Sequence, residues 1–155
     1  MDASAQMRTV GIDRMKVLIV DSEYHIRKVI RALLLGMGCT RIFEASEGES
    51  GLAAIRAVHP DLVLLDWELP GMSGAEFVRG LRYDAAFAYR RPAIIMMAAH
   101  SKRTRVLEAV RLGIHEFLLK PVSHDALRDR MLAVLSKPAA LQSNDERPES
   151  RKLAG

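Results

Sequence analysis

The feature that most constrains the fold is a series of five short apolar runs, at residues 17–20, 42–43, 62–65, 94–97 and 117–119. Most of these runs are continuously apolar rather than alternating. That pattern is typical of strands buried on both faces, as in a parallel sheet. The run at 42–43 is the weakest, so we expect it near an edge of the sheet.

Each run is followed by a segment whose apolar residues recur every three or four positions, which is the period of an amphipathic helix. Strand followed by helix, five times over, predicts an α/β fold with a parallel sheet and right-handed crossovers. The pattern occupies residues 15–136. The helical stripes consist of Ile26, Val29, Ile30, Leu33, Leu34 and Met37; Leu52, Ile55 and Val58; Phe77, Val78 and Leu81; Val106, Leu107, Val110 and Leu112; and Leu127, Met131, Val134 and Leu135.

Helix boundary signals agree with this pattern. Two Ser/Glu pairs have the spacing of a capping box, and two further serines are expected N-caps. Glycines near residues 36–38 and at 113 lie where helices are expected to end. The capping residues are Ser46 with Glu49, Ser73 with Glu76, Ser101 and Ser123.

The remaining segments are tails. Residues 1–14 show no clear period and are predicted to be a flexible N-terminal tail, and the polar residues 137–155 are predicted to be disordered. Cys39 is the only cysteine, which excludes a disulfide scaffold. No apolar run approaches the ~18 residues that span a bilayer, and no secretory signal is evident, so we expect a cytoplasmic protein without a membrane segment.

Three charged residues directly follow apolar runs: Asp21 after the first, Asp66 after the third and Lys120 after the fifth. Ligands of open parallel sheets bind at the carboxyl ends of the strands, so we expect these side chains on one edge. Two close carboxylates repel each other unless a cation intervenes. Magnesium suits a site with one or two carboxylates, waters and a phosphate. The set therefore predicts phosphoryl transfer to an aspartate nucleophile.

The motifs around these residues resemble the receiver domain of bacterial two-component response regulators. Val-Leu-Ile-Val-Asp21, the Asp-x-x-x-Pro-x-x-x-Gly segment from Asp66 to Gly74, and Phe-Leu-Leu-Lys120-Pro121 stand in the family order. The resemblance covers residues 15–136. It implies a flavodoxin-like, doubly wound sheet of five parallel strands in the order 2-1-3-4-5, with five helices.

The resemblance also implies roles for individual residues. Asp66 would be the phosphoacceptor, and Asp21, Asp66 and the backbone carbonyl of Glu68 would hold Mg²⁺. Lys120 would pair with the phosphoryl group, and the peptide bond to Pro121 would be cis.

Three positions depart from the family pattern. Ser22 stands where a second acidic residue is usual; its hydroxyl is either a weak magnesium ligand or the cap of the first helix, and the cap is the simpler interpretation. Ala98 replaces the usual Thr or Ser of the switch and has no hydroxyl. Phe117 stands at an aromatic switch position often held by Tyr. We expect weak metal affinity and a degenerate switch.

Trp67 and Glu68 follow Asp66 and are expected at the mouth of the site. Trp67 either contacts a partner or shields the rim. Glu68 and His100 either influence the access of water to an acyl phosphate or are ordinary polar loop residues.

The net charge is +4, from 23 basic and 19 acidic residues. Basic residues gather around the helices after the third and fourth runs, and some of them oppose the helix dipole. An acidic partner or nucleic acid would explain them, but plain solubility is the simpler explanation. No helix-turn-helix candidate lies outside the receiver-like region, so direct DNA binding is not expected. The basic residues are Arg79, Arg82, Arg90, Arg91, Lys102, Arg103 and Arg105.

The leading hypothesis is a single-domain response regulator rather than an enzyme. A histidine kinase or histidine phosphotransfer protein would be the donor, and a downstream protein would be bound. By resemblance, the partner surface lies on the fourth helix, fifth strand and fifth helix and includes Arg103, His115, Glu116 and Arg128. Homodimerisation stays open.

Two alternatives come from other classes. Ser22 and Ala98 fit a pseudo-receiver, an adaptor that works without phosphorylation, whereas Asp66 and Lys120 argue against it. A flavin enzyme is the weaker alternative, because the acidic segment after the first run would repel a phosphate group.

Overall fold

The computed structural model describes residues 11–87, 91–99 and 103–136. Its five strands form one parallel sheet in the order β2-β1-β3-β4-β5, which confirms the predicted fold class and places β2 at an edge. The strands are β1 (Lys16–Val20), β2 (Arg41–Ala45), β3 (Leu62–Asp66), β4 (Ala93–Ala98) and β5 (Glu116–Leu119).

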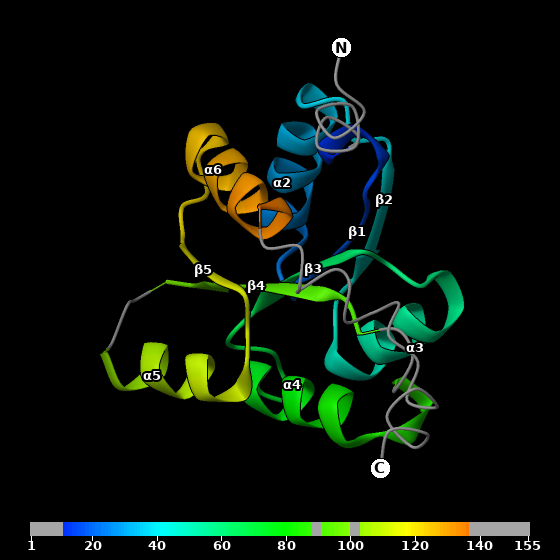
Figure 1. Cartoon of the computed structure of the whole chain (residues 1–155), viewed down its shortest axis with the longest axis vertical. Helices are drawn as coiled ribbons and strands as arrows, with labels where there is room; N and C mark the ends of the chain where they lie inside the picture. Colours follow the sequence, from blue (N-terminus) through cyan, green and yellow to red (C-terminus); the bar gives the residue numbers. More distant parts are fainter. Residues whose placement is uncertain (1–10, 88–90, 100–102, 137–155) are drawn as a thin grey trace.

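Five α-helices cover the two faces of the sheet. Helices α2 and α6 lie on one face, and α3, α4 and α5 lie on the other (Figure 1). Two short 3-10 helices, η1 (Ile12–Arg14) and η2 (Ala85–Phe87), precede β1 and follow α4. The α-helices are α2 (Tyr24–Gly36), α3 (Gly48–Val58), α4 (Gly74–Tyr83), α5 (Arg103–Leu112) and α6 (His124–Leu135).

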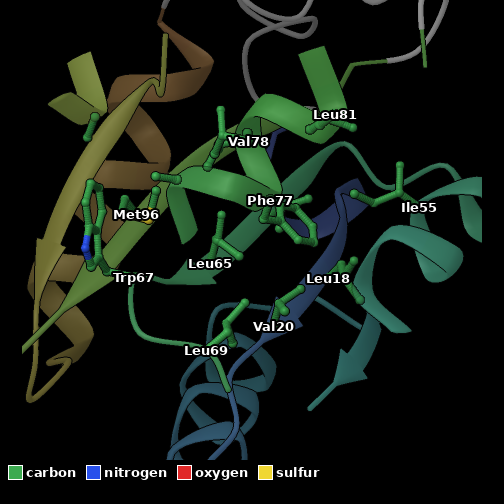
Figure 2. Packing of buried hydrophobic residues seen from close by; sticks show 14 of the residues in the cluster. Leu18, Val20, Ile55, Leu65, Trp67, Leu69, Phe77, Val78, Leu81 and Met96 are labelled. Carbon is green, nitrogen blue, oxygen red and sulfur yellow. The ribbon is translucent and has the colours of Figure 1, made fainter. Parts of the chain in front are cut away.

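The two faces of the sheet explain why the apolar runs are continuous. Leu18 and Val20 of β1 pack in the cluster beneath α3, α4 and α5, together with Phe77 of α4 (Figure 2). Val17 and Ile19 point to the opposite face, into the cluster beneath α2 and α6. Successive side chains of a strand alternate between faces, so a strand with a core on both sides needs apolar residues at every position.

Two of the predicted helix caps are confirmed. Ser73 Oγ accepts a hydrogen bond from the Glu76 backbone N–H at 3.1 Å, at the start of α4. Ser123 Oγ accepts one from Ala126 N–H at 3.2 Å, at the start of α6. The predicted cap Ser101 lies outside the described residues.

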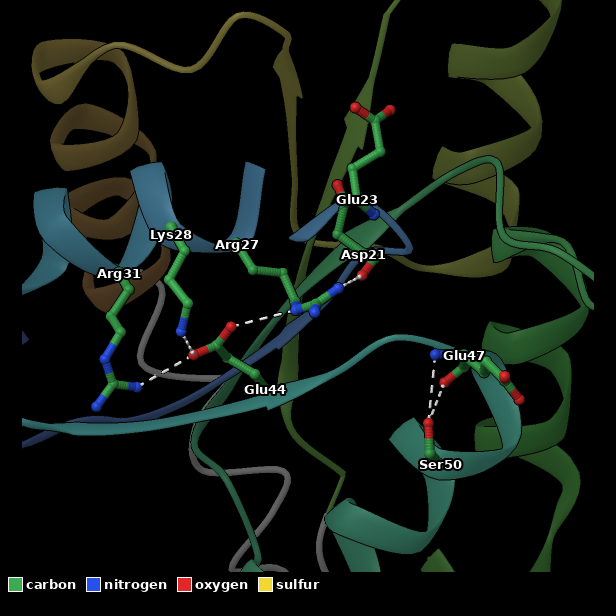
Figure 3. A network of polar contacts seen from close by, with 8 residues as sticks. All are labelled: Asp21, Glu23, Arg27, Lys28, Arg31, Glu44, Glu47 and Ser50. Carbon is green, nitrogen blue, oxygen red and sulfur yellow. Dashed lines mark hydrogen bonds and ion pairs between the residues drawn. The ribbon is translucent and has the colours of Figure 1, made fainter. Parts of the chain in front are cut away.

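The capping box predicted at Ser46 and Glu49 is wrong by one residue. The N-cap of α3 is Glu47, whose backbone N–H donates to Ser50 Oγ at 3.2 Å (Figure 3). The start of the helix packs closely against Met72, where a Cβ added to Gly48 would lie 2.6 Å from the sulfur. A larger residue at position 48 would therefore force the Met72 side chain to shift.

The ends of the described chain bear on the predicted tails. Residues 12–14, which we assigned to the flexible N-terminal tail, form η1. The rest of that tail and residues 137–155 lie outside the described residues, so both tails stay predictions. No helix in the described part of the chain is long and apolar enough to cross a membrane.

Candidate functional site

The three charged residues that follow strands meet at the carboxyl edge of the sheet. Asp21 comes directly after β1, Asp66 is the last residue of the neighbouring β3, and Lys120 comes directly after β5. Lys120 Nζ lies 2.7 Å from Asp21 Oδ2 and 3.4 Å from Asp66 Oδ2. Asp21 is 0% and Asp66 5% exposed, and no other charged residue of the described chain is as buried. The structure therefore brings together the three side chains that the sequence pattern singled out.

Backbone groups hold both carboxylates in place. Asp21 Oδ1 accepts a hydrogen bond from Glu23 N–H at 2.8 Å, and Asp66 Oδ1 accepts one from Glu68 N–H at 3.1 Å. Lys120 N–H donates to the carbonyl of Ala98 at 2.9 Å, which ties the residue after β5 to the end of β4. The Lys120–Pro121 peptide bond is cis, as the resemblance implied.

The two carboxylates and the ammonium influence each other's ionisation. Burial and the neighbouring charge of Asp21 raise the pKa of Asp66, and these effects outweigh the opposing attraction of Lys120. Burial alone would lower the pKa of Lys120, but its contact with Asp21 and the charges of both carboxylates raise it instead. Lys120 therefore stays charged. With both carboxylates ionised, the single ammonium of Lys120 balances only one of the two negative charges. The remaining negative charge favours the binding of a further cation.

The donor set fits a magnesium ion that keeps several waters. Asp21 Oδ2 is buried and lies 2.7 Å from Lys120 Nζ, and no other contact of this oxygen is described, so it keeps acceptor capacity for a cation. No group of three His, Cys, Asp or Glu side chains suited to a metal occurs among the described residues. Magnesium needs only one or two carboxylates when waters and a phosphate complete its octahedron. Asp21, Asp66 and the carbonyl of Glu68 would supply the protein ligands.

Ser22 does not cap the first helix, so that prediction is wrong. The N-cap of α2 is Glu23, which makes no side-chain capping bond, and Ser22 is exposed. The physical reason is that Asp21 Oδ1 already accepts the Glu23 N–H, which starts the helix one residue later. A weak contact from Ser22 to magnesium stays a prediction.

Arg27 on α2 supports the segment that carries Asp21, and the sequence analysis missed it. Its Nη1 donates to the backbone carbonyl of Asp21 at 2.7 Å, and its Nε pairs with Glu44 of β2 at 3.1 Å (Figure 3). Glu44 also pairs with Lys28 and Arg31, each at 3.3 Å. The sequence did contain a signal for this contact. Three basic residues lie on one face of the helix that became α2, and a single carboxylate, Glu44, lies on the edge strand β2.

The switch positions carry no polar side-chain group. Ala98 is buried at the end of β4 and belongs to the cluster beneath α3, α4 and α5. Phe117 of β5 is partly buried and packs against the same cluster. The side chains at these two positions therefore offer packing contacts but no hydrogen bond to a phosphoryl group.

Trp67 lies in the core, not at the mouth of the site as expected. It is 7% exposed, belongs to the cluster beneath α3, α4 and α5, and lies beside Met96 (Figure 2). Its burial argues against a partner contact, because the ring is covered by the chain itself. Glu68 does lie at the rim, and its Oε1 pairs with Arg105 Nη1 of α5 at 2.9 Å. His100 lies outside the described residues.

Most of the described basic residues near α4 and α5 are engaged within the chain. Arg79 pairs with Glu108 at 3.3 Å, and Arg105 pairs with Glu68. Arg82 and Arg91 donate to backbone carbonyls. These contacts leave few of the described arginines near α4 and α5 free to bind an acidic partner or nucleic acid. Arg90 and Lys102 lie outside the described residues, and so does the side chain of Arg103.

The predicted partner surface is only partly assembled as expected. His115 Nδ1 accepts a hydrogen bond from Ile94 N–H at 2.9 Å, and Glu116 of β5 lies 3.8 Å from Arg130 of α6. Arg128 lines a pocket of about 430 Å³ between η1, the end of α2 and α6, and its assignment to the partner surface stays a prediction. Arg128 and Arg130 are two positions apart on α6, and their side chains therefore point in nearly opposite directions.

Comparisons with known proteins agree with this geometry. Residues 17–132 match the family model described as the response regulator receiver domain. The chain is 29% identical over 123 residues to the chemotaxis protein CheY of Pseudomonas aeruginosa, which covers 79% of this chain and 98% of that protein. It is 34% identical over 129 residues to the KDP operon transcriptional regulatory protein KdpE of Escherichia coli, covering 83% of this chain and 55% of that protein.

Solved structures show the same fold. Chemotaxis protein CheY4 of Vibrio cholerae has a TM-score of 0.67 at 26% identity, and the match covers 74% of this chain and 93% of that chain. The signal receiver domain of NarL from Mycobacterium tuberculosis has a TM-score of 0.68 at 30% identity, covering 79% of this chain and 97% of that chain.

Proposed function

Because the chain belongs to the response regulator receiver domain family, we propose that Asp66 accepts a phosphoryl group from a histidine kinase or a histidine phosphotransfer protein. The observation that carries this proposal is the buried pair of carboxylates, Asp21 and Asp66, with Lys120 Nζ within ion-pair distance of both. A receiver domain is not a classical enzyme, and the only catalysis we propose is its own phosphorylation and dephosphorylation.

The proposed transfer is a displacement at phosphorus. A carboxylate oxygen of Asp66 attacks the phosphorus of a donor phosphohistidine, a P–O bond forms and the P–N bond breaks. The electron pair returns to the imidazole nitrogen, which takes up a proton. Lys120 offers a fixed positive charge to the equatorial oxygens, where negative charge is spread in the transition state.

Magnesium fits this reaction as the second source of positive charge. When bound, it would neutralise charge between the carboxylates and the phosphoryl oxygens. Asp21 and Asp66 would hold it through their carboxylates and Glu68 through its backbone carbonyl, and Ser22 would add at most a weak contact. Because the position after Asp21 carries no carboxylate, we expect weak affinity.

The proposed output is binding of a downstream protein in the cytoplasm, as a single-domain response regulator. The match to nearly the full length of a chemotaxis CheY supports this arrangement. The surface formed by α5, β5 and α6 would carry the signal. We propose no direct DNA binding, and homodimerisation is left to experiment.

A pseudo-receiver that acts as an adaptor without phosphorylation is the second candidate. Buried Ala98 favours it, because no side-chain hydroxyl is available there to follow a phosphoryl group. The intact Asp21, Asp66 and Lys120 arrangement favours the first candidate. A flavin enzyme is not proposed, because the chain belongs to the receiver family.

Incubation with acetyl phosphate and magnesium, followed by intact mass spectrometry, tests the two candidates. We expect the mass of one phosphoryl group, absent in Asp66→Asn and retained in Asp125→Asn, which alters an exposed carboxylate. No gain at saturating donor and metal would favour the adaptor. A gain that survives Asp66→Asn would show that the phosphoacceptor is assigned to the wrong residue.

A further inference from the structure

A second cluster of charged residues lies at the opposite edge of the sheet from Asp66. Arg82 is in the last turn of α4, Arg91 precedes β4, and Gly113 lies between α5 and β5. The strands run parallel, so this edge holds the amino ends of β4 and β5. Nothing in the proposed phosphoryl transfer uses these residues.

The two guanidinium groups are held by backbone carbonyls. Arg82 Nη2 donates to the carbonyl of Gly113 at 2.7 Å, and Arg91 Nη2 donates to the carbonyl of Arg82 at 2.6 Å. Arg82 also packs directly on Gly113, where an added Cβ would collide with its guanidinium. The Nε atoms of both arginines are buried and have no hydrogen-bond partner. Both cations are thus preorganised but incompletely bonded.

Arg82 and Arg91 are half-buried and have no carboxylate partner in the described chain, and this combination sets them apart from the other arginines whose side chains are described. Burial and the charge of Arg91 lower the pKa of Arg82, as two close like charges require. The other described arginines without an ion pair, at positions 14, 41, 111 and 128, are exposed to solvent. Six arginines do pair with carboxylates: Arg27, Arg31, Arg56, Arg79, Arg105 and Arg130.

Helix dipoles offset only part of this charge. The carbonyl of Arg82 lies at the carboxyl end of α4, and such an end is equivalent to about half a negative charge. The two guanidinium groups carry two full positive charges, so most of the positive charge at this edge of the sheet stays unbalanced. Burial makes that excess costly unless an anion balances it.

We propose that Arg82 and Arg91 form an oxyanion site for the phosphate group of a small phosphorylated molecule. A phosphate carries about −1.5 to −2 charge near neutral pH, which matches two guanidinium groups better than a single carboxylate does. Each guanidinium has five N–H donors in a planar fork suited to phosphate oxygens, and the contacts described above occupy one donor on each. A bound phosphate would join the end of α4 to the segment that leads into β4.

Isothermal titration calorimetry with inorganic phosphate and with AMP tests this site on the full chain. EDTA is present throughout, so that no metal-bound phosphate forms near Asp66, and chloride at matched ionic strength controls for screening. We expect binding in the millimolar range or tighter. Replacement of Arg91 by Gln should weaken it about tenfold or more, because a charge-assisted hydrogen bond is lost.

Control variants separate this site from other cations. Arg79→Gln removes one guanidinium from α4, the helix that also carries Arg82, but this arginine pairs with Glu108, and the variant should leave phosphate affinity unchanged. Lys120→Gln should also leave it unchanged, because Lys120 lies at the other edge of the sheet. Arg91→Lys keeps the charge without the planar fork, and its affinity should lie between wild type and Arg91→Gln.

The outcomes decide the proposal without depending on Asp66. Stronger binding of AMP than of inorganic phosphate would identify a nucleotide source, and equal binding would show that the phosphate group alone is recognised. No detectable binding of either ligand would overturn the proposal, as would equal affinity of wild type and Arg91→Gln. Loss of binding in Lys120→Gln but not in Arg91→Gln would place the anion at the other edge.

Discussion

Replacement of Lys120 by Met offers a direct test of the electrostatics at the carboxyl edge. The substitution keeps a long, flexible side chain but removes the ammonium that lies 2.7 Å from Asp21 and 3.4 Å from Asp66. Both carboxylates would stay buried with no cation described beside them. The free energy of unfolding should therefore fall, and it should fall most when no divalent ion is present.

The size of the effect follows from burial. Removal of one partner from a buried ion pair costs about 3–5 kcal/mol, because the remaining charge is desolvated and unpaired. The Lys120 side chain is 13% exposed and one carboxyl can take up a proton, so we expect the low end, about 3 kcal/mol. Domains of this kind have about 5–15 kcal/mol of stability in total, so such a loss is easily measured.

Urea denaturation with EDTA and with magnesium is the assay. Magnesium should stabilise Lys120→Met more than it stabilises wild type, because the ion no longer competes with an ammonium for Asp21 Oδ2. Lys28→Met is the matched control, since Lys28 forms an exposed ion pair with Glu44 and its loss should cost less than about 1 kcal/mol. If Lys120→Met unfolds in EDTA at the same urea concentration as wild type, the buried charge cluster does not exist as described.

Three further predictions concern packing and the thiol. Gly113→Ala should destabilise the fold by more than about 1 kcal/mol, measured by urea denaturation. Gly113 has a positive φ of 83°, and an added Cβ would collide with the Arg82 guanidinium. Gly36→Ala is the control, because an added Cβ there meets open space and the substitution should be nearly neutral. Phe77→Ala should cost about 3–5 kcal/mol in the same assay, since Phe77 is fully buried, and a cost below 1 kcal/mol would contradict that packing. Burial raises the pKa of Cys39, so the native thiol should stay unreactive toward a disulfide reagent at neutral pH and react on unfolding; rapid reaction of the folded protein would refute its burial.

The sheet was predictable because its signal is local. Three of the apolar runs have four residues, and each helical stripe has its own period, so the alternation is visible without any tertiary information, although the two-residue run at 42–43 gives only a weak signal for β2. The order 2-1-3-4-5 came instead from the family resemblance, since the strand pattern alone allows several arrangements. The meeting of Asp21, Asp66 and Lys120 was predictable for a related reason. Parallel strands place all their carboxyl ends on one edge of the sheet.

The errors share a different cause. Ser22 and Ser46 were plausible caps by spacing. In the structure, Glu23 is the N-cap of α2 and its N–H donates to Asp21 Oδ1, and Glu47 is the N-cap of α3 in a capping box with Ser50. Trp67 was expected at the rim, yet its ring turns into the core. In each case the outcome depends on a neighbour distant in sequence, or on the direction of one side chain.

For this protein, the sequence by itself determined the α/β class, the five strands and the three residues that meet at their ends. These features follow from hydrophobic periodicity and from the geometry common to all parallel sheets. Only the tertiary structure decided that Arg27 braces the backbone of Asp21 and that Arg82 and Arg91 lie together with no carboxylate partner among the described residues. Such contacts join residues on separate elements, and they depend on side-chain directions and burial that exist only once the helices have packed on the sheet.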